Sequence, residues 1–169
     1  MHKSVRDFIH RVKTLYPEVF ENESTIEFGS LNINGSPREF FNSKNYIGVD
    51  AKSGDCVDKV SLCHEYKGHT DKSFDTVIST EMLEHDPYWD LSVDKMVSLV
   101  KDCGSLIITA GGRHRHPHGQ TTYTPIERYY RNITCSGLLQ SICLRGRFKK
   151  ICLENNGDVD LLLFCYWRY

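Results

Sequence analysis

The C-terminal segment Leu161-Leu-Leu-Phe-Cys-Tyr-Trp167 is apolar at every position. A strand with one face in solvent alternates apolar and polar residues, so a strand without a polar face is covered on both sides. The segment 148–153 precedes it, and Asn155-Asn-Gly-Asp158 lies between the two, a composition that predicts a β-hairpin. We therefore expect the chain to end in an antiparallel hairpin whose last strand lies inside a sheet.

Upstream of this hairpin, strand-like and helix-like patterns alternate. Apolar residues at helical spacing predict a helix over 4–16 that ends before Pro17. Ser36 and Pro37 predict a second helix start, as cap and first helical residue. We expect Gly104 to close a further helix that ends at Val100. The remaining expected elements are a helix at 136–145 and strands at 24–29, 46–50, 57–62, 74–80, 105–110, 148–153 and 159–166.

This alternation is typical of an α/β fold with helices on both faces of a parallel sheet. The sequence thus predicts a Rossmann-like, doubly wound, mostly parallel seven-stranded sheet with an antiparallel C-terminal strand. At 169 residues we expect one domain, made of an N-terminal helix (1–16), a ligand-binding half (24–110) and a C-terminal part with a loop, a helix and the terminal hairpin (111–169). Without a long apolar run or an apolar signal core, the expected location is cytoplasmic, with no membrane partner.

Three residues predict a ligand site at the ends of the first two strands. Gly29 provides a sharp exit from the first strand, and Asp50 ends the second strand twenty-one residues later, a spacing that suits hydrogen bonds to ribose hydroxyls. Glu27, just before the glycine, disfavours a dinucleotide, because its carboxylate would repel a pyrophosphate. The turn also lacks the Gly-x-Gly-x-x-Gly spacing, which disfavours a nicotinamide-dependent oxidoreductase.

Four blocks of the sequence resemble the class I S-adenosylmethionine-dependent methyltransferases, in particular the small methyltransferase type 11 group. They are Glu27-Phe-Gly-Ser-Leu-Asn-Ile-Asn-Gly-Ser36, Tyr46-Ile-Gly-Val-Asp50, Ser73-Phe-Asp-Thr-Val-Ile-Ser-Thr-Glu-Met-Leu-Glu-His85 and Asp102-Cys-Gly-Ser-Leu-Ile-Ile-Thr109. The third block is the most specific. The first departs from the family pattern, because Leu31 and Ile33 stand where glycines are common, although Asn34-Gly35 can complete the turn instead.

The resemblance implies S-adenosyl-L-methionine as the cofactor and a set of residues that would hold it. The methionine end would contact Glu27, Gly29 and Ser30, in the turn that Gly35 completes, and Asp50 would hold the ribose. The adenine would lie near Ala51, Cys63 and His64, and the methyl group above Thr80 and Glu81.

Two histidines are candidate catalytic residues, although methyl transfer needs chiefly alignment and calls for a base only if the acceptor must lose a proton. His85 lies just after the fourth strand. Its alternative role is to order this loop through hydrogen bonds, together with Glu84. His118 lies in Arg113-His-Arg-His-Pro-His-Gly119, on the loop expected to face the acceptor. Alternating histidines there could also bind zinc, but no nearby acid or cysteine completes such a site, so we predict no metal.

The acceptor is the least constrained part of the prediction. The segment 113–150 holds eight Lys and Arg residues and one acid, Glu127, so we expect a small or anionic acceptor beside it, against the alternative of a solvated basic face. Tyrosines interleaved with arginines near 123–131 leave a nucleotide-like acceptor open. The predicted function is methyl transfer to such an acceptor, with a non-catalytic cofactor- or partner-binding module as the alternative.

Overall fold

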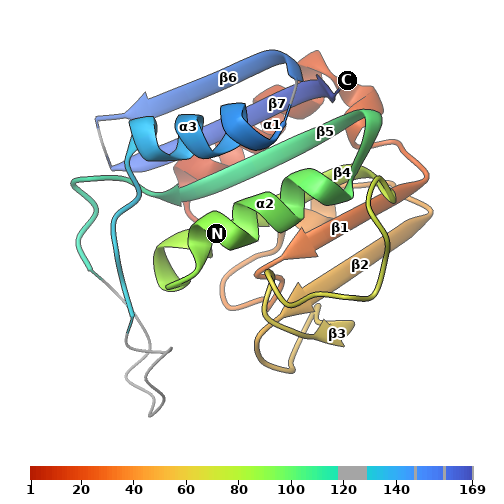
Figure 1. The fold of residues 1–169 in the computed structure, drawn as a ribbon, viewed down its shortest axis with the longest axis horizontal. Helices are drawn as coiled ribbons and strands as arrows, with labels where there is room; N and C mark the ends of the chain where they lie inside the picture. The colour runs from red at the N-terminus through yellow and green to blue at the C-terminus, as the bar shows by residue number, and fades with distance from the viewer. Residues whose placement is uncertain (118–128, 147, 158, 169) are drawn as a thin grey trace.

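The computed structural model describes residues 1–117, 129–146, 148–157 and 159–168. These residues form one seven-stranded sheet with three α-helices around it (Figure 1). The helices are α1 (Lys3–Leu15), α2 (Trp89–Leu99) and α3 (Cys135–Arg145). The strands are β1 (Ser24–Phe28), β2 (Asn45–Asp50), β3 (Lys59–Val60), β4 (Phe74–Thr80), β5 (Val100–Gly111), β6 (Phe148–Asn156) and β7 (Asp160–Arg168).

The strand order is β3-β2-β1-β4-β5-β7-β6. The first five strands pair in parallel, and β7 runs antiparallel between β5 and β6. The predicted C-terminal hairpin is therefore confirmed, and its apolar strand lies inside the sheet. The reversal at β1, where the chain runs to β2 on one side and β4 on the other, is where open α/β sheets bind ligands.

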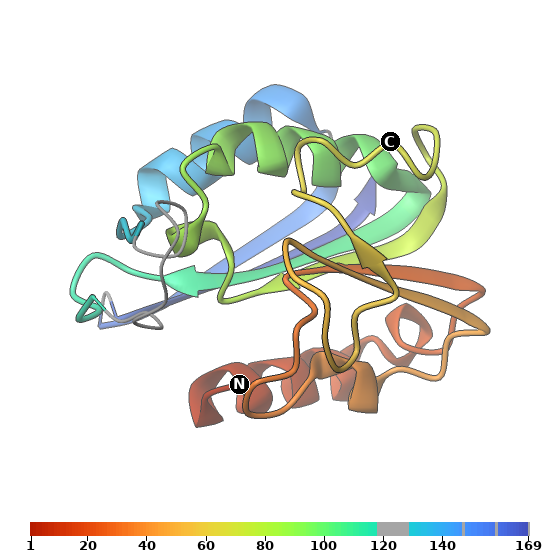
Figure 2. The ribbon, with the colours of Figure 1, turned by 90° about the horizontal axis from the view of Figure 1, so that it is seen from below.

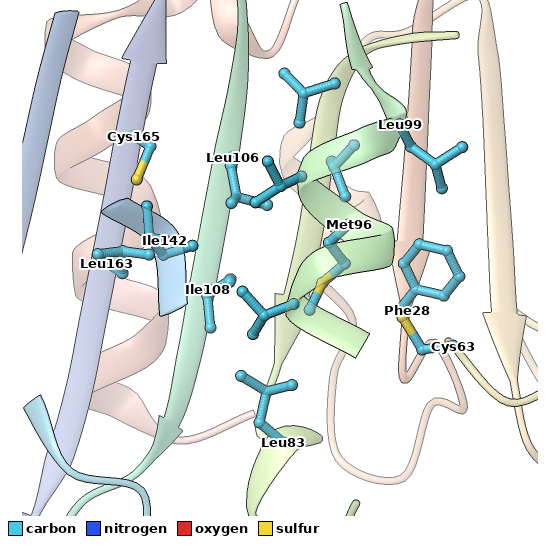
Figure 3. Close-up of a cluster of buried hydrophobic side chains, with 14 of the residues drawn as sticks. Phe28, Cys63, Leu83, Met96, Leu99, Leu106, Ile108, Ile142, Leu163 and Cys165 are labelled. Atoms are coloured by element: carbon cyan, nitrogen blue, oxygen red, sulfur yellow. The ribbon is translucent and has the colours of Figure 1, made fainter. Parts of the chain in front are cut away.

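Helices cover both faces of the sheet, α2 and α3 on one side and α1 on the other (Figure 2). The packing of β7 on both faces explains the apolar run that follows Asp160 in this strand. Leu161, Leu163 and Cys165 belong to the core under α2 and α3, while Leu162 and Phe164 belong to the core under α1. Figure 3 shows the larger core, which extends from Cys165 to Phe28 and Cys63. The doubly wound prediction is thus confirmed.

The first expected crossover helix is shorter than predicted. Ser36 does cap it, since its Oγ accepts from the Arg38 N–H at 3.1 Å, but the element is a single 3-10 turn, η2 (Pro37–Phe40). Helix α1, which precedes β1, covers that face of the sheet instead, with Phe8 and Ile9 in its core. The predicted third strand also shrinks, to the two residues of β3.

The prediction for Gly104 was wrong. Helix α2 ends at Leu99, and Gly104 lies inside β5, which begins at Val100. A Cβ at this position would lie 2.9 Å from the carbonyl oxygen of Asp75 on β4, so the glycine permits close approach of two strands rather than a helix end. The register of β4 and β5 shifts at this point.

None of the helices in the described part of the chain is long and apolar enough to cross a membrane.

Candidate functional site

A cleft of about 510 Å³ opens at the carboxyl ends of the central parallel strands. The arrowheads of β1 and β2 point to this edge of the sheet (Figure 1). The loops that follow β1, β2, β3 and β4 line it, together with the residues that precede α1. A volume of this size suits a small-molecule ligand.

The turn after β1 depends on Gly29, whose φ of +79° is a left-handed conformation that side chains rarely adopt. A Cβ here would also lie 2.7 Å from the Met82 Cβ in the loop after β4. Behind the turn, the N–H groups of Gly29 and Ser30 both donate to the Val49 carbonyl of β2. The glycine thus lets two loops meet, and Gly29, Ser30 and Gly35 all line the cleft.

Asp50, at the end of β2, orders the polypeptide around the cleft. One of its carboxylate oxygens accepts from the Leu31 N–H at 3.1 Å, and the other accepts from the Lys52 N–H at 3.0 Å. Each oxygen keeps further acceptor capacity, because a carboxylate oxygen can accept two hydrogen bonds. Asp50 and its neighbour Ala51 both line the cleft.

Glu27 lies inside β1 with only 1% of its surface exposed, and it also lines the cleft. Burial raises the pKa of its carboxyl to about 7, and the hydrogen bond from the Tyr46 hydroxyl, at 2.9 Å, works in the opposite direction. A buried carboxyl of this kind gains from a cationic ligand group, which would favour its ionised form.

Cys63 and His64, predicted together, separate in the structure. Cys63 is buried and lines the cleft, and its thiol contacts the Ser92 carbonyl at 3.6 Å. Burial raises the pKa of this thiol. His64 does not line the cleft. Its ring packs against the ring of Tyr88, with the centroids 4.7 Å apart, and Tyr88 does line the cleft.

Thr80 and Glu81 form the cleft wall at the end of β4. Glu81 has a φ of +55°, and its side chain is 14% exposed. The Thr109 hydroxyl donates to one carboxylate oxygen at 3.0 Å, and the Arg115 guanidinium donates to the other at 3.4 Å. Arg115 also pairs with the buried Asp160.

Glu84 and His85 follow in a short 3-10 turn, η3 (Leu83–His85). His85 lines the cleft, and its ring meets the Tyr130 ring edge-on at 5.3 Å. Glu84 is fully buried, and neither carboxyl oxygen has a well-formed hydrogen bond within the described residues. Burial, reinforced by the charge of Glu81, raises the pKa of Glu84 to about 8, while backbone amides nearby moderate the shift.

The basic segment 113–150 does not gather at this cleft. Lys150 lies on the outermost strand, β6, opposite Tyr166 of β7. Its ammonium donates to the Tyr16 hydroxyl at 2.7 Å. Arg145 pairs with Asp94 on α2. Among the described residues of this segment, none lines the cleft. The charge pattern that favoured an anionic acceptor therefore reflects several surfaces, and His118 lies outside the described residues.

Sequence reasoning missed the contribution of the N-terminus. Met1 and His2 line the cleft, and the His2 Nε2 lies 3.8 Å from a carboxylate oxygen of Glu81. It also missed Tyr46 as the partner of Glu27. Neither contact has a local sequence signal, because each depends on how distant segments pack. Within the part of the chain that the structure describes, no group of three or more acids, histidines or cysteines could hold a metal ion.

Comparison with known proteins gives a fold but no sequence family. No protein-family model matches the chain, and no curated protein matches its sequence. Among solved structures, a 1,6-didemethyltoxoflavin-N1-methyltransferase from Burkholderia thailandensis with bound S-adenosylhomocysteine is 14% identical, with a TM-score of 0.62 over 98% of this chain and 78% of that one. Phosphoethanolamine N-methyltransferase 2 from Haemonchus contortus, in complex with S-adenosyl-L-methionine, is 18% identical, with a TM-score of 0.63 over 89% and 38%.

The same fold also carries another reaction. The [4+2]-cyclase SpnF is 13% identical and matches with a TM-score of 0.61 over 90% of this chain and 61% of its own. A fold alone thus does not fix the chemistry. What the strand order, the switch point and these neighbours establish together is that the chain has the Rossmann-like fold of the class I S-adenosylmethionine-dependent methyltransferases.

Proposed function

We propose that this chain binds S-adenosyl-L-methionine in the cleft and transfers its methyl group to a small-molecule acceptor. The observation that carries the proposal is that Glu27 and Asp50 line one cleft at the switch point of the sheet. Two carboxylates there suit a nucleoside with cationic groups and no phosphate. The neighbours of this fold with bound S-adenosylmethionine or S-adenosylhomocysteine support the same ligand.

The residues present fit this cofactor. The Ser30 hydroxyl is buried and lines the cleft, and it has no hydrogen-bond partner within the described residues. Such a group calls for a ligand atom that can pair with it. The missing side chain at Gly29 leaves the turn open beside it, and the cleft volume is sufficient for one nucleoside with its amino-acid tail.

Each lining residue then has a physical role. Asp50 accepts from the ribose hydroxyls, and its bonds to the Leu31 and Lys52 amides keep its oxygens in place. Glu27, in its ionised form, pairs with the ammonium group, and Ser30 hydrogen-bonds the same end. Ala51 and Cys63 pack against the adenine, while His64 acts through Tyr88. Thr80 and Glu81 border the space beside the methyl group.

The cofactor, when bound, supplies a methyl carbon that its sulfonium already activates. The protein therefore has mainly to align the acceptor and exclude water, which can supply several kcal/mol. His85, at the cleft wall, and His118 remain the predicted proton acceptors for an acceptor that must lose a proton. Membership of the methyltransferase type 11 group and a cytoplasmic location remain predictions.

Two measurements test the proposal together. Titration calorimetry should show one site for S-adenosylhomocysteine and none for NAD. Incubation with methyl-labelled S-adenosylmethionine and fractionated cell extract should then transfer label to a small molecule. Binding without any methyl transfer would favour a non-catalytic module that only binds the cofactor. Binding of NAD alone would overturn S-adenosylmethionine as the ligand.

A further inference from the structure

The sheet ends in two edge strands of very different length. Strand β3, at one edge, has two residues, and β6, at the other, has nine (Figure 1). Within the described part of the chain, no further strand pairs with the outer side of β6. Such an edge offers its backbone N–H and C=O groups to another strand, and proteins usually protect it by shortness, proline or a bulge.

Strand β6 has none of these three protections. It contains no proline, and it keeps one register with β7 from Phe148 to Asn156, so no bulge turns its edge away. Strand β3, in contrast, is protected by its shortness. The outer side of β6 is therefore a long, regular edge that suits pairing with a further strand.

The middle of β6 is apolar and only partly covered. Ile151, Cys152 and Leu153 are consecutive apolar residues. Ile151 and Leu153 pack against the core under α2 and α3 but stay half-buried, whereas the residues opposite them on β7, Cys165 and Leu163, are fully buried. A strand along the outer side of β6 would cover the apolar surface that these two residues still expose.

The charged residues of β6 lie symmetrically about this apolar centre. Lys150 comes two residues before Cys152, and Glu154 comes two residues after it. Both side chains lie on the α1 face and are exposed, although Lys150 donates to the Tyr16 hydroxyl and Glu154 pairs with Arg11. An ammonium has three donors and a carboxylate has about four acceptor positions, so each can bind a further partner.

This symmetry makes the strand complementary to a second copy of itself. In a symmetric antiparallel pair, one residue faces its own copy across the twofold axis. With Cys152 at that place, Ile151 faces Leu153 of the other copy. Lys150 likewise faces Glu154 of the other copy, twice in the interface. Moving the axis to a neighbouring residue would separate the charges, so the pairing has one favoured register.

We propose that two copies of this chain pair along β6, antiparallel and about Cys152, to form a dimer with one continuous sheet. Such a twofold interface is closed, because pairing occupies the long edge of both copies. Only the two-residue edges of β3 then remain, so the assembly stops at two chains. No residue of β6, all nine of which the structure describes, lines the cleft, so the dimer is independent of the proposed methyl transfer.

Sedimentation velocity of the full chain, over a wide range of protein concentrations, measures this assembly. The mass of one chain is 19.5 kDa, and we expect a reversible dimer of twice that mass. A chain that stays monomeric at every concentration would leave the edge to a strand of another protein and would overturn the proposal. Growth into larger assemblies would overturn it as well.

Two charge reversals test both the surface and the register. Lys150→Glu and Glu154→Lys each place like charges opposite one another at both ends of the interface. Each variant alone should therefore self-associate about tenfold or more weakly than the wild type. In an equal mixture, the two variants bring opposite charges together again and should recover the dimer as a mixed pair. A damaged fold in either chain could not be repaired by mixing.

Lys44→Glu is the matched control. It breaks an exposed ion pair with Glu23 beside β1 and β2, far from β6 in the sheet, and should associate like the wild type. A dimer that neither reversal weakens would use another face. A dimer that both reversals weaken and that mixing does not recover would mean that positions 150 and 154 do not face each other. Either result would overturn the proposed pairing.

Discussion

The Tyr46 hydroxyl on β2 donates a hydrogen bond to the buried Glu27 carboxyl on β1 at 2.9 Å. This bond engages one oxygen of a carboxyl that also lines the cleft. Burial of the phenol, followed by the charge of Glu27 and this hydrogen bond, raises the pKa of Tyr46, so the tyrosine stays a donor at neutral pH. The pair therefore holds a carboxyl that a bound cation can ionise.

Cofactor binding should depend on pH through Glu27. Its pKa in the free protein is about 7, so the carboxyl is largely neutral at about pH 6 and must lose its proton to pair with an ammonium. The affinity for S-adenosylhomocysteine should thus rise by about tenfold between roughly pH 6 and pH 8. Calorimetry across this range measures it, and Glu27→Gln should flatten the profile. A profile that is equally steep in the variant would exclude Glu27 as its source.

Asp50 should be required for ribose binding rather than for the turn alone. Asp50→Ala should weaken S-adenosylhomocysteine binding at least about tenfold, since it removes contacts to the ribose and to the Leu31 and Lys52 amides. Asp50→Asn keeps one oxygen acceptor and should lose less. Calorimetry compares the variants with homocysteine, which lacks the ribose. Unchanged affinity of the alanine variant for S-adenosylhomocysteine would contradict the assignment.

Gly29 should be far less replaceable than a glycine of similar conformation elsewhere. Gly29 has a φ of +79° and would place a Cβ 2.7 Å from Met82, whereas Gly157 has a φ of +60° and no atom within 4 Å of its Cβ position. Gly157→Ala should therefore cost only the backbone term, about 1–2 kcal/mol. Gly29→Ala should cost more and also weaken cofactor binding. Urea unfolding compares them, and equal losses of stability would argue against a close approach at Gly29.

Glu84 should make the fold less stable as pH rises. Its folded pKa, about 8, lies above the usual value of a glutamate, so the folded protein holds a proton that the unfolded chain releases. The contribution of Glu84 to the free energy of unfolding is fully present below the unfolded-state pKa and is lost as pH rises from that value through about 8. Glu84→Gln should remove this dependence and leave the protein more stable at about pH 9. Denaturant midpoints across pH measure it, and parallel curves for both proteins would contradict the buried acid.

The fold could be predicted because its main signals are local. The unbroken apolar run of β7 required cover on both faces, and its residues do alternate between the two cores. The ends of β1 and β2 could be placed because Gly29 and Asp50 are turn-forming and strand-ending residues. Gly104 was misassigned because a glycine that permits a close strand contact has the same local signature as one that ends a helix.

The parts of the site that sequence could not give are contacts between distant segments. The bonds from Arg115 to Glu81 and Asp160 join residues of three separate regions, and only the assembled sheet brings them together. The same is true of His2 and Glu81. The count of basic residues in 113–150 misdirected the acceptor prediction, since charges that are close in sequence lie in different places: Arg115 contacts Glu81, Arg145 contacts Asp94 on α2, and Lys150 contacts Tyr16.

The most direct test of the account is a crystal structure of the chain with S-adenosylhomocysteine. We predict the ribose hydroxyls on the Asp50 carboxylate, the ammonium within hydrogen-bonding distance of Glu27, and the sulfur facing Glu81. A ligand bound elsewhere, or one that leaves both Glu27 and Asp50 without contact, would contradict the proposed use of this cleft.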